Sequence, residues 1–201
     1  MIKAVVFDFG GVLLRTEDQG GRERWEARLG LPPRGLSKLV FDSDAARRAT
    51  AGDAGVDAVW GHVATTLQLE PAVLAELQKD FWSGDRLDDA LVTLIKGLRP
   101  RYKTAILSNA WPDGRGLFTQ LFGASDTFDL FIISSEERLA KPDARLYQLA
   151  AERLGVQPSE VVFVDDFLHN VDGARAAAMQ AIHYTPGLDV AAALRAVGVA
   201  V

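Results

Sequence analysis

Residues 4–13 read AVVFDFGGVL, and this stretch decides the fold class. The run from Ala4 to Phe7 is apolar without alternation, which is typical of a strand buried on both faces of a parallel sheet. Asp8 ends the run, at the place where open α/β sheets bind their ligands. Gly10 and Gly11 follow, and glycine lets a backbone approach a small anion or metal closely. Capping a turn is a common use of aspartate, but the glycine pair favours a functional site at Asp8.

Further strand and helix patterns extend from this stretch to the C-terminus. Four more apolar runs predict strands, over Thr104 to Leu107, Leu130 to Ile133, Val161 to Val164 and, more weakly, Ala181 to Tyr184. Helical patterns separate the later runs, over Leu87 to Leu98, Asp143 to Leu154 and Val171 to Met179. Alternation of strands and helices is typical of a parallel sheet covered on both faces. The sequence thus predicts an α/β fold with a doubly wound, Rossmann-like parallel sheet of five strands.

Residues 15–86 do not follow this alternation of strands and helices, because they carry no strong strand signal. Their amphipathic patterns predict helices around Gly21 to Leu29, Leu36 to Ala49, Val56 to Leu67 and Pro71 to Phe81. A plain helical subdomain would explain them, but their insertion directly after Asp8 favours a cap that closes over the site and selects substrate. We expect a core domain of residues 1–14 and 87–201 and a small all-helical cap domain of residues 15–86.

Composition and charge exclude several classes of function. The chain has 201 residues, a net charge of −5 and no cysteine. The negative charge gives no reason to expect nucleic acid or an anionic membrane as a partner. Without cysteine, any metal would be bound by oxygen or histidine. No apolar run reaches the ~18 residues of a membrane span, and we expect a cytoplasmic protein whose oligomeric state the sequence leaves open.

Ser108 and Asn109 follow directly after the second predicted strand. A hydroxyl group and backbone N–H groups at the end of a strand can hold phosphoryl oxygens. An ordinary Ser/Asn turn is the competing interpretation. The pair therefore becomes informative only together with the other motifs.

Lys141 precedes Pro142 and the helix predicted from Asp143. A solvated lysine ahead of a helix is the plain alternative. The chain has only six lysines, which weakens that alternative. An ammonium group near Asp8 would reduce the repulsion when one anion attacks another.

Asp165 and Asp166 end the strand Val161 to Val164. Two adjacent carboxylates at the end of a buried strand repel each other unless a cation lies between them. Mg²⁺ fits, because it prefers oxygen and is held by one or two carboxylates plus phosphate and water. A helix N-cap would need only one of the two residues.

These four segments, in this order and position, resemble the four motifs of the haloacid dehalogenase-like hydrolases, and the resemblance spans Asp8 to Asn170. It implies that Asp8 is a covalent nucleophile, usually toward phosphate esters, and that Lys141 neutralises both the nucleophile and the transferring phosphoryl group. The expected phosphate-binding residues are Ser108, Asn109 and Gly11. Mg²⁺ would be held by Asp8, the Gly10 carbonyl and Asp166, with Asp165 as a ligand or behind one. Asn170 falls at the family's second acidic position.

Gly10 departs from the family pattern, which usually has a second aspartate there. That carboxyl group protonates the leaving oxygen and later activates water, and its loss typically costs about 10²- to 10⁴-fold in rate. Three explanations stay open. The substrate has a good leaving group, such as an acyl phosphate, an anhydride or an anomeric sugar phosphate; another residue among His169, Glu17 and Asp18 substitutes; or turnover is lost. One known branch of the family carries the DFGGVL form.

The leading hypothesis is a Mg²⁺-dependent phosphatase acting on a small phosphorylated metabolite. A haloacid dehalogenase, whose aspartate attacks carbon, also lacks the second aspartate but needs no metal. It would leave the pair Asp165 and Asp166 unexplained. A non-catalytic module that binds a phosphorylated ligand is the rival from another class. The predicted cap has no motif that identifies the substrate.

Overall fold

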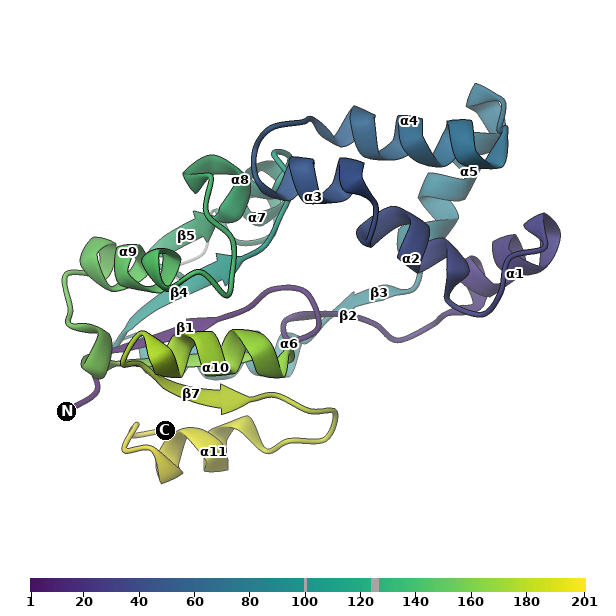
Figure 1. The fold of residues 1–201 in the computed structure, drawn as a ribbon. Coiled ribbons are helices and arrows are strands. Elements are labelled where there is room, and N and C mark those ends of the chain that lie inside the picture. The colour runs from purple at the N-terminus through teal and green to yellow at the C-terminus, as the bar shows by residue number, and fades with distance from the viewer. Residues whose placement is uncertain (100, 124–126) are drawn as a thin grey trace.

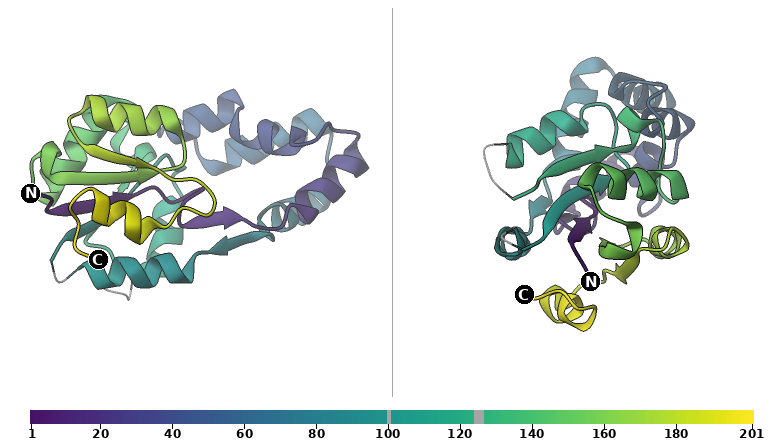
Figure 2. Two further views of the ribbon diagram at one scale, coloured as in Figure 1. Left: turned by 90° about the horizontal axis from the view of Figure 1, so that it is seen from below. Right: turned by 90° about the vertical axis from the view of Figure 1, so that its left-hand side faces the viewer.

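The computed structural model describes residues 1–99, 101–123 and 127–201. Its core is a five-stranded sheet in the order β5-β4-β1-β6-β7, with every neighbouring pair parallel. The strands are β1 (Ala4–Phe7), β4 (Lys103–Ser108), β5 (Leu130–Ile133), β6 (Val161–Asp165) and β7 (Gln180–His183). Helices cover both faces of the sheet (Figure 1, Figure 2). The predicted α/β fold with five parallel strands is confirmed.

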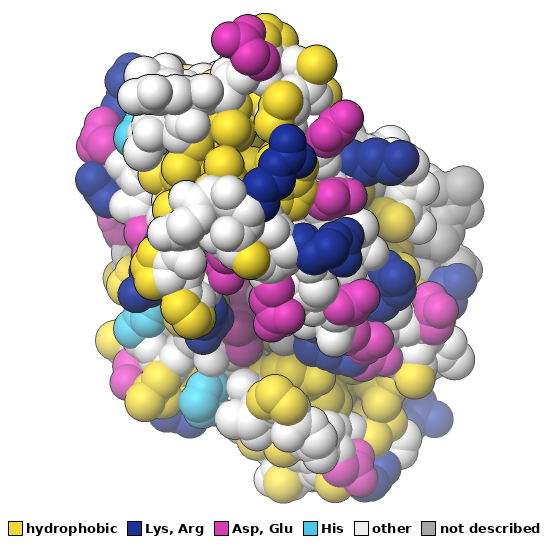
Figure 3. Space-filling view, turned by 90° about the vertical axis from the view of Figure 1, so that its right-hand side faces the viewer, with side chains coloured by type: hydrophobic (Ala, Val, Ile, Leu, Met, Phe, Trp, Pro, Cys, Tyr) yellow, Lys and Arg dark blue, Asp and Glu magenta, His cyan; other side chains and the backbone are white. Residues whose placement is uncertain are grey.

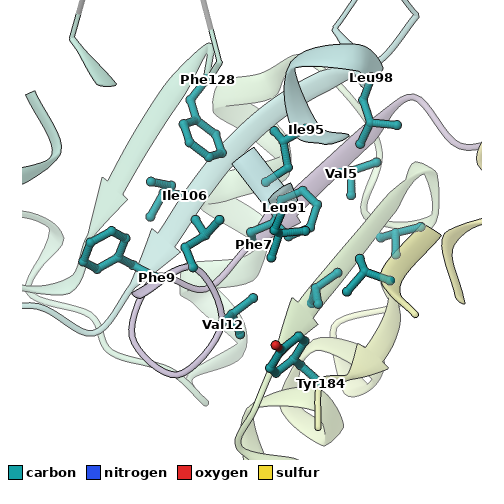
Figure 4. Packing of buried hydrophobic residues seen from close by; sticks show 14 of the residues in the cluster. Val5, Phe7, Phe9, Val12, Leu91, Ile95, Leu98, Ile106, Phe128 and Tyr184 are labelled. Atoms are coloured by element: carbon teal, nitrogen blue, oxygen red, sulfur yellow. The ribbon is translucent and has the colours of Figure 1, made fainter. Parts of the chain in front are cut away.

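Alternate residues of the central strand β1 pack against opposite layers of helices. Val5 and Phe7 join the cluster formed with α6 (Asp89–Leu98), α7 (Gly114–Phe122) and α11 (Val190–Ala196). Figure 4 shows Leu91, Ile95 and Leu98 of α6 beside Val5 and Phe7. Ala4 and Val6 belong to the cluster on the other face, with α9 (Ala144–Leu154) and α10 (Leu168–Ala176). Burial on both faces explains the unbroken apolar runs in the sequence.

Five helices lie between β1 and α6 and form a separate hydrophobic cluster around Trp25, Leu36 and Phe81. They are α1 (Gly20–Leu29), α2 (Gly35–Phe41), α3 (Asp44–Thr50), α4 (Val56–Leu67) and α5 (Pro71–Trp82), which we call the cap. The single helix expected over Leu36 to Ala49 is wrong, because α2 and α3 are separate and the Ser43 side chain caps α3 by accepting from the Ala46 N–H. On the face of the molecule that carries the end of the cap, hydrophobic side chains gather in the upper middle, and a band of charged side chains of both signs crosses the centre (Figure 3).

A two-stranded antiparallel ribbon joins the cap to the core, and the sequence analysis did not predict it. Its strands are β2 (Leu14–Thr16) and β3 (Asp85–Leu87), with Leu14 opposite Leu87 and Thr16 opposite Asp85. Arg15 fixes the base of the ribbon, since its Nη1 atom lies 2.9 Å from Asp88 Oδ2 and 3.0 Å from the Tyr184 hydroxyl. The chain therefore leaves and re-enters the core at adjacent points.

The cap also contacts the core at a second place, near α8 (Ser134–Glu137). The Ser134 hydroxyl donates to the Thr50 carbonyl at 2.8 Å. Gly52 has a φ of +77°, and a Cβ atom there would lie 2.1 Å from the Ser135 carbonyl oxygen, so only glycine fits this contact. Trp111, after β4, adds ring contacts to Phe41 of the cap at 5.9 Å. Contacts at two separate places fix the position of the cap over the ends of the strands.

None of the helices in the described ranges is long and apolar enough to cross a lipid bilayer.

Candidate active site

The candidate residues lie at the carboxyl ends of the three central strands of the sheet. β1 lies between β4 and β6, and these three strands run in the same direction. Asp8 directly follows β1, Ser108 is the last residue of β4, and Asp165 is the last residue of β6. Parallel pairing therefore brings to one edge three segments that are far apart in the sequence.

Lys141 is the centre of a buried ion triad. Its Nζ atom lies 2.7 Å from Asp8 Oδ1 and 2.7 Å from Asp165 Oδ2. The three side chains are 1%, 8% and 0% exposed, so their charges interact with little screening by water. Two carboxylates share one ammonium, which leaves the triad with a net negative charge. The convergence expected from the sequence is present in the structure.

Asn109 holds the backbone of Lys141 in place. The Asn109 side chain donates from Nδ2 to the Lys141 carbonyl at 3.0 Å, and its Oδ1 accepts from the Lys141 N–H at 2.8 Å. This pair of bonds uses both polar atoms of the amide. Ser108 lies beside it and is buried. The side chain of Asn109 is thus occupied with orienting Lys141, while a phosphate contact from Ser108 or Asn109 stays a prediction.

The two neighbouring carboxylates of Asp165 and Asp166 differ in their surroundings. Asp165 Oδ1 accepts from the Phe167 N–H at 2.8 Å, and Asn170 Nδ2 lies 3.0 and 3.1 Å from the two Asp165 oxygens. With Lys141 added, both Asp165 oxygens are engaged. Asp166 Oδ1, by contrast, is buried and has no hydrogen-bond partner. A buried carboxylate oxygen without a partner is costly, and a bound cation would relieve that cost.

Asn170 has a structural role that the sequence analysis did not assign. It lies in the first turn of α10, is 3% exposed, and donates to Asp165. The sequence did contain a signal for this role. Asn170 is four residues after Asp166, and a residue at that spacing on the first turn of a helix can point back to the end of the strand.

Gly11 allows Asp166 to approach the first loop. Its φ is +81°, and a Cβ atom there would lie 2.1 Å from Asp166 Oδ2. Gly10 is exposed, and a Cβ atom on it would meet nothing within 4 Å. The two glycines therefore have different surroundings. Gly11 is required by close packing against a carboxylate, while Gly10 faces open space.

Burial shifts the ionisation of the acidic cluster. Desolvation raises the pKa of Asp8 from 3.8 to about 7, although the Lys141 ammonium opposes the shift. The pKa of Asp166 is also raised, first by desolvation and then by the charge of Asp165. Both shifts apply to the metal-free protein, and a cation at this place would reverse them.

The cluster has the donors that Mg²⁺ prefers. One oxygen each from Asp8, Asp165 and Asp166 lie within 4.8 Å of one another. Among the described residues, this is the one group of three or more acidic or histidine side chains close enough to share an ion. Hard carboxylate oxygens and the unpartnered Asp166 Oδ1 fit Mg²⁺.

The three residues considered as substitutes for a second aspartate have other surroundings. Glu17 lies 3.6 Å from the Arg15 guanidinium and is exposed. Asp18 Oδ1 accepts from the Gly20 N–H at 2.8 Å. His169 is exposed on α10, with its ring centroid 5.4 Å from that of Phe167.

Comparison with known proteins shows the family of the chain. A family model described as haloacid dehalogenase-like hydrolase matches residues 2–178. A phosphatase from Mycobacterium tuberculosis is 31% identical over 90% of this chain and 86% of its own length. An (S)-2-haloacid dehalogenase from Xanthobacter autotrophicus is 38% identical over 55% of this chain, and the match spans only 44% of that enzyme.

A solved structure has the same fold over nearly the whole chain. It is a family enzyme from Bacteroides thetaiotaomicron in complex with magnesium and inorganic phosphate, with a TM-score of 0.79. The likeness covers 97% of this chain and 100% of that one at 19% identity, which shows the fold alone. The family model and the mycobacterial relative together settle the family. The chain belongs to the haloacid dehalogenase-like hydrolases.

Proposed function

We propose that this hydrolase is a Mg²⁺-dependent phosphatase of a small phosphorylated metabolite and that it works through an aspartyl-phosphate on Asp8. The observation that carries the proposal is Asp166, whose buried Oδ1 has no partner beside the ion triad of Asp8, Lys141 and Asp165. An enzyme whose nucleophile attacks carbon needs no metal, and the buried Asp166 oxygen would then have no cation to pair with. An anionic phosphate bound next to three carboxylates needs additional positive charge.

Each residue of the cluster takes a role that follows from its contacts. The Asp8 carboxylate, oriented by Lys141 and the Phe9 N–H, attacks phosphorus. Lys141 neutralises the nucleophile and the phosphoryl group during attack. Asp166 and Asp8, with the Gly10 carbonyl, would hold Mg²⁺, and Asp165 would support the site indirectly because its oxygens are already engaged. Bound Mg²⁺ supplies positive charge to the phosphoryl oxygens and orients them.

Phosphate release from p-nitrophenyl phosphate tests the proposal. We expect turnover that requires Mg²⁺ and stops with a chelator. The alternative, a dehalogenase, is favoured by the similarity to the Xanthobacter enzyme and by glycine at position 10. It would instead release chloride from a chlorinated propionate without metal, and that result would overturn the proposal. Phosphorylation of the protein without turnover would favour a binding or regulatory module.

Mg²⁺ binding is expected to strengthen as pH rises. Because the pKa of Asp8 is raised to about 7, this carboxyl is protonated at pH 6 and must lose its proton to bind metal. For one such proton, the dissociation constant of Mg²⁺ should be about tenfold higher at pH 6 than at pH 8. Titration calorimetry at the two pH values measures this ratio.

The same shift predicts how the metal-free protein responds to pH. A carboxyl with a raised pKa in the folded state contributes stability below its unfolded value of 3.8, and that contribution is lost as pH rises through about 7. Mg²⁺ should therefore raise the melting temperature more at pH 8 than at pH 6. Equal shifts at both pH values would contradict an ionisation of Asp8 linked to metal binding.

Gly11→Ala should weaken Mg²⁺ binding by about 10- to 100-fold, because the new methyl group displaces the Asp166 carboxylate. Gly30→Ala is the matched control. Gly30 also has a positive φ, of +67°, but a Cβ there meets nothing within 4 Å. Both variants carry left-handed backbone strain of about 1–2 kcal/mol, measured by urea unfolding. Only Gly11→Ala should lose affinity for the metal, and equal affinities in the two variants would contradict the role of Asp166.

A further inference from the structure

Position 10 has space for an acidic side chain, but the residue there is glycine. Gly10 is two residues after Asp8 and is exposed, and a Cβ atom built on it meets nothing within 4 Å. A side chain here would extend into open space, two residues along the chain from the nucleophile. No packing requirement explains glycine at this position, in contrast to Gly11, where Asp166 lies 2.1 Å from the added atom. The backbone thus accommodates a proton donor that the chain does not supply.

Of the two acidic groups beside Asp8, Asp166 would hold Mg²⁺ in the proposed function, and Asp165 is committed to contacts within the site. Asp165 accepts hydrogen bonds on both oxygens, from Lys141, Phe167 and Asn170. An ionised carboxylate accepts hydrogen bonds and has no proton to donate. Lys141 forms two 2.7 Å ion pairs, and giving up its proton would leave both carboxylates without a counter-charge. Neither group is a suitable proton donor for a leaving oxygen.

The candidates outside the triad are also engaged elsewhere. Glu17 pairs with Arg15, and Asp18 accepts from the backbone of Gly20 at the start of α1. His169 is exposed on α10, where its ring lies tilted against that of Phe167. Within the described ranges, the acidic side chains that share the site with Asp8 are Asp165 and Asp166.

We infer that the leaving group departs as an anion, without a proton from the protein, so that the enzyme is built for phosphoryl compounds with acidic leaving groups, such as acyl phosphates. This inference rests on the proposed function. In the first step a bond forms between Asp8 and phosphorus while the bond from phosphorus to the leaving oxygen breaks, and the leaving oxygen keeps the electron pair. Solvent protonates it afterwards if its pKa requires. In the second step a bond forms between water oxygen and phosphorus while the bond from phosphorus to the Asp8 oxygen breaks; the Asp8 carboxylate keeps the electron pair, inorganic phosphate leaves, and the proton of the attacking water passes to solvent.

The same missing group affects the second step. A carboxylate at position 10 would also remove the proton from the attacking water. Without it, hydrolysis of the aspartyl-phosphate is slow relative to its formation from an activated substrate. The structure therefore predicts that phospho-enzyme accumulates, and rapid mixing should show a burst of released leaving group close to one equivalent per site before the steady state.

A series of para-substituted phenyl phosphates tests the inference. With Mg²⁺ present, kcat/KM should rise steeply along the series from methoxy to hydrogen to chloro to nitro, because each step lowers the pKa of the departing phenol. kcat/KM is the right quantity, since it reports formation of the phospho-enzyme even where its hydrolysis limits kcat. A shallow dependence, as expected when a general acid assists departure, would overturn the inference. Absence of Mg²⁺-dependent release even from the nitro compound would instead reject the proposed function.

Gly10→Asp and Gly10→Asn form the matched pair. The open space at position 10 accommodates both side chains, and only the aspartate carries a proton. Gly10→Asp should make kcat/KM depend less on the pKa of the departing phenol, and it should raise kcat/KM for phenyl phosphate by up to about 10²-fold. Gly10→Asn should keep the steep dependence of the wild type. Melting temperatures verify that both variants fold. If kcat/KM depends on the pKa of the departing phenol as steeply in Gly10→Asp as in the wild type, an acid at position 10 does not assist departure and the inference is overturned.

Discussion

Asp8→Asn is expected to lower kcat/KM for p-nitrophenyl phosphate by about 10⁴-fold or more, the scale seen when a covalent nucleophile is removed. The amide is nearly isosteric with the carboxylate, but it is neutral and a poor nucleophile toward phosphorus. The Lys141 ammonium at 2.7 Å would then face an amide oxygen and keep its ion pair with Asp165. Steady-state kinetics with Mg²⁺ measures the loss, and acid-stable protein phosphorylation should be absent throughout.

Asp57→Asn is a control for that experiment. Asp57 is exposed in the first turn of α4, in the cap, so the same chemical change there should leave kcat/KM unaltered. Acid-quenched mixtures of wild-type enzyme should contain a phosphorylated species that base or hydroxylamine releases, as acyl phosphates do. Activity that survives Asp8→Asn would show that another group attacks phosphorus.

Lys141→Met is expected to destabilise the metal-free protein by about 3–5 kcal/mol, because it leaves the charges of two buried carboxylates unpaired. Asp8 is 8% and Asp165 0% exposed at the side chain, so water cannot replace the ammonium. Methionine fills much of the same space, and the loss therefore reports charge rather than a cavity. Urea unfolding at pH 8 with a chelator present measures the change. Activity should be lost as well, since the phosphoryl group loses its counter-charge.

Lys79→Met is the matched control for this substitution. Lys79 is exposed on α5, and surface changes of this kind usually stay within about 0.5 kcal/mol. Adding Asp165→Asn to Lys141→Met should recover part of the lost stability, because one of the unpaired charges is removed. If Lys141→Met is no more destabilising than Lys79→Met, the triad does not stabilise the core in the way its geometry indicates.

Much of the core could be predicted from the sequence, for a physical reason. Strands buried on both faces are mostly apolar without alternation, so the central parts of β1, β4 and β6 are visible as apolar runs. The ribbon of β2 and β3 could not be found in the same way. Each strand has three residues with a single leucine, and their pairing joins positions some 70 residues apart in sequence, as Leu14 and Leu87 do. Such pairing depends on tertiary context rather than on local pattern.

The break between α2 and α3 had a local signal that the periodicity concealed. Ser43 followed by Asp44 is a typical helix start, and Ser43 caps α3. The apolar pattern nevertheless continues from Leu36 to Ala49, because both helices face the same cluster. Hydrophobic period alone does not distinguish one long helix from two short ones that bury the same side.

The members of the acidic cluster could be predicted, but their separate environments could not. Asp165 and Asp166 are chemically identical neighbours, and successive side chains of a strand point in opposite directions. Which one meets Lys141 and which lies against Gly11 depends on the register of β6 beside β1, in which Phe7 is opposite Val164.

The antiparallel pairing of Leu14 with Leu87 makes everything between the two strands, in topological terms, the loop of a hairpin. The entropy of closing a loop grows only slowly with its length, so a hairpin of this kind accepts inserts of very different size at little cost to the scaffold. A helical module with other dimensions can therefore be grafted onto the same two strands while the nucleophile and its ammonium partner stay where they are. Residues 14 and 87 are thereby the positions at which the helical insert can be exchanged by recombination without altering the sheet that carries Asp8.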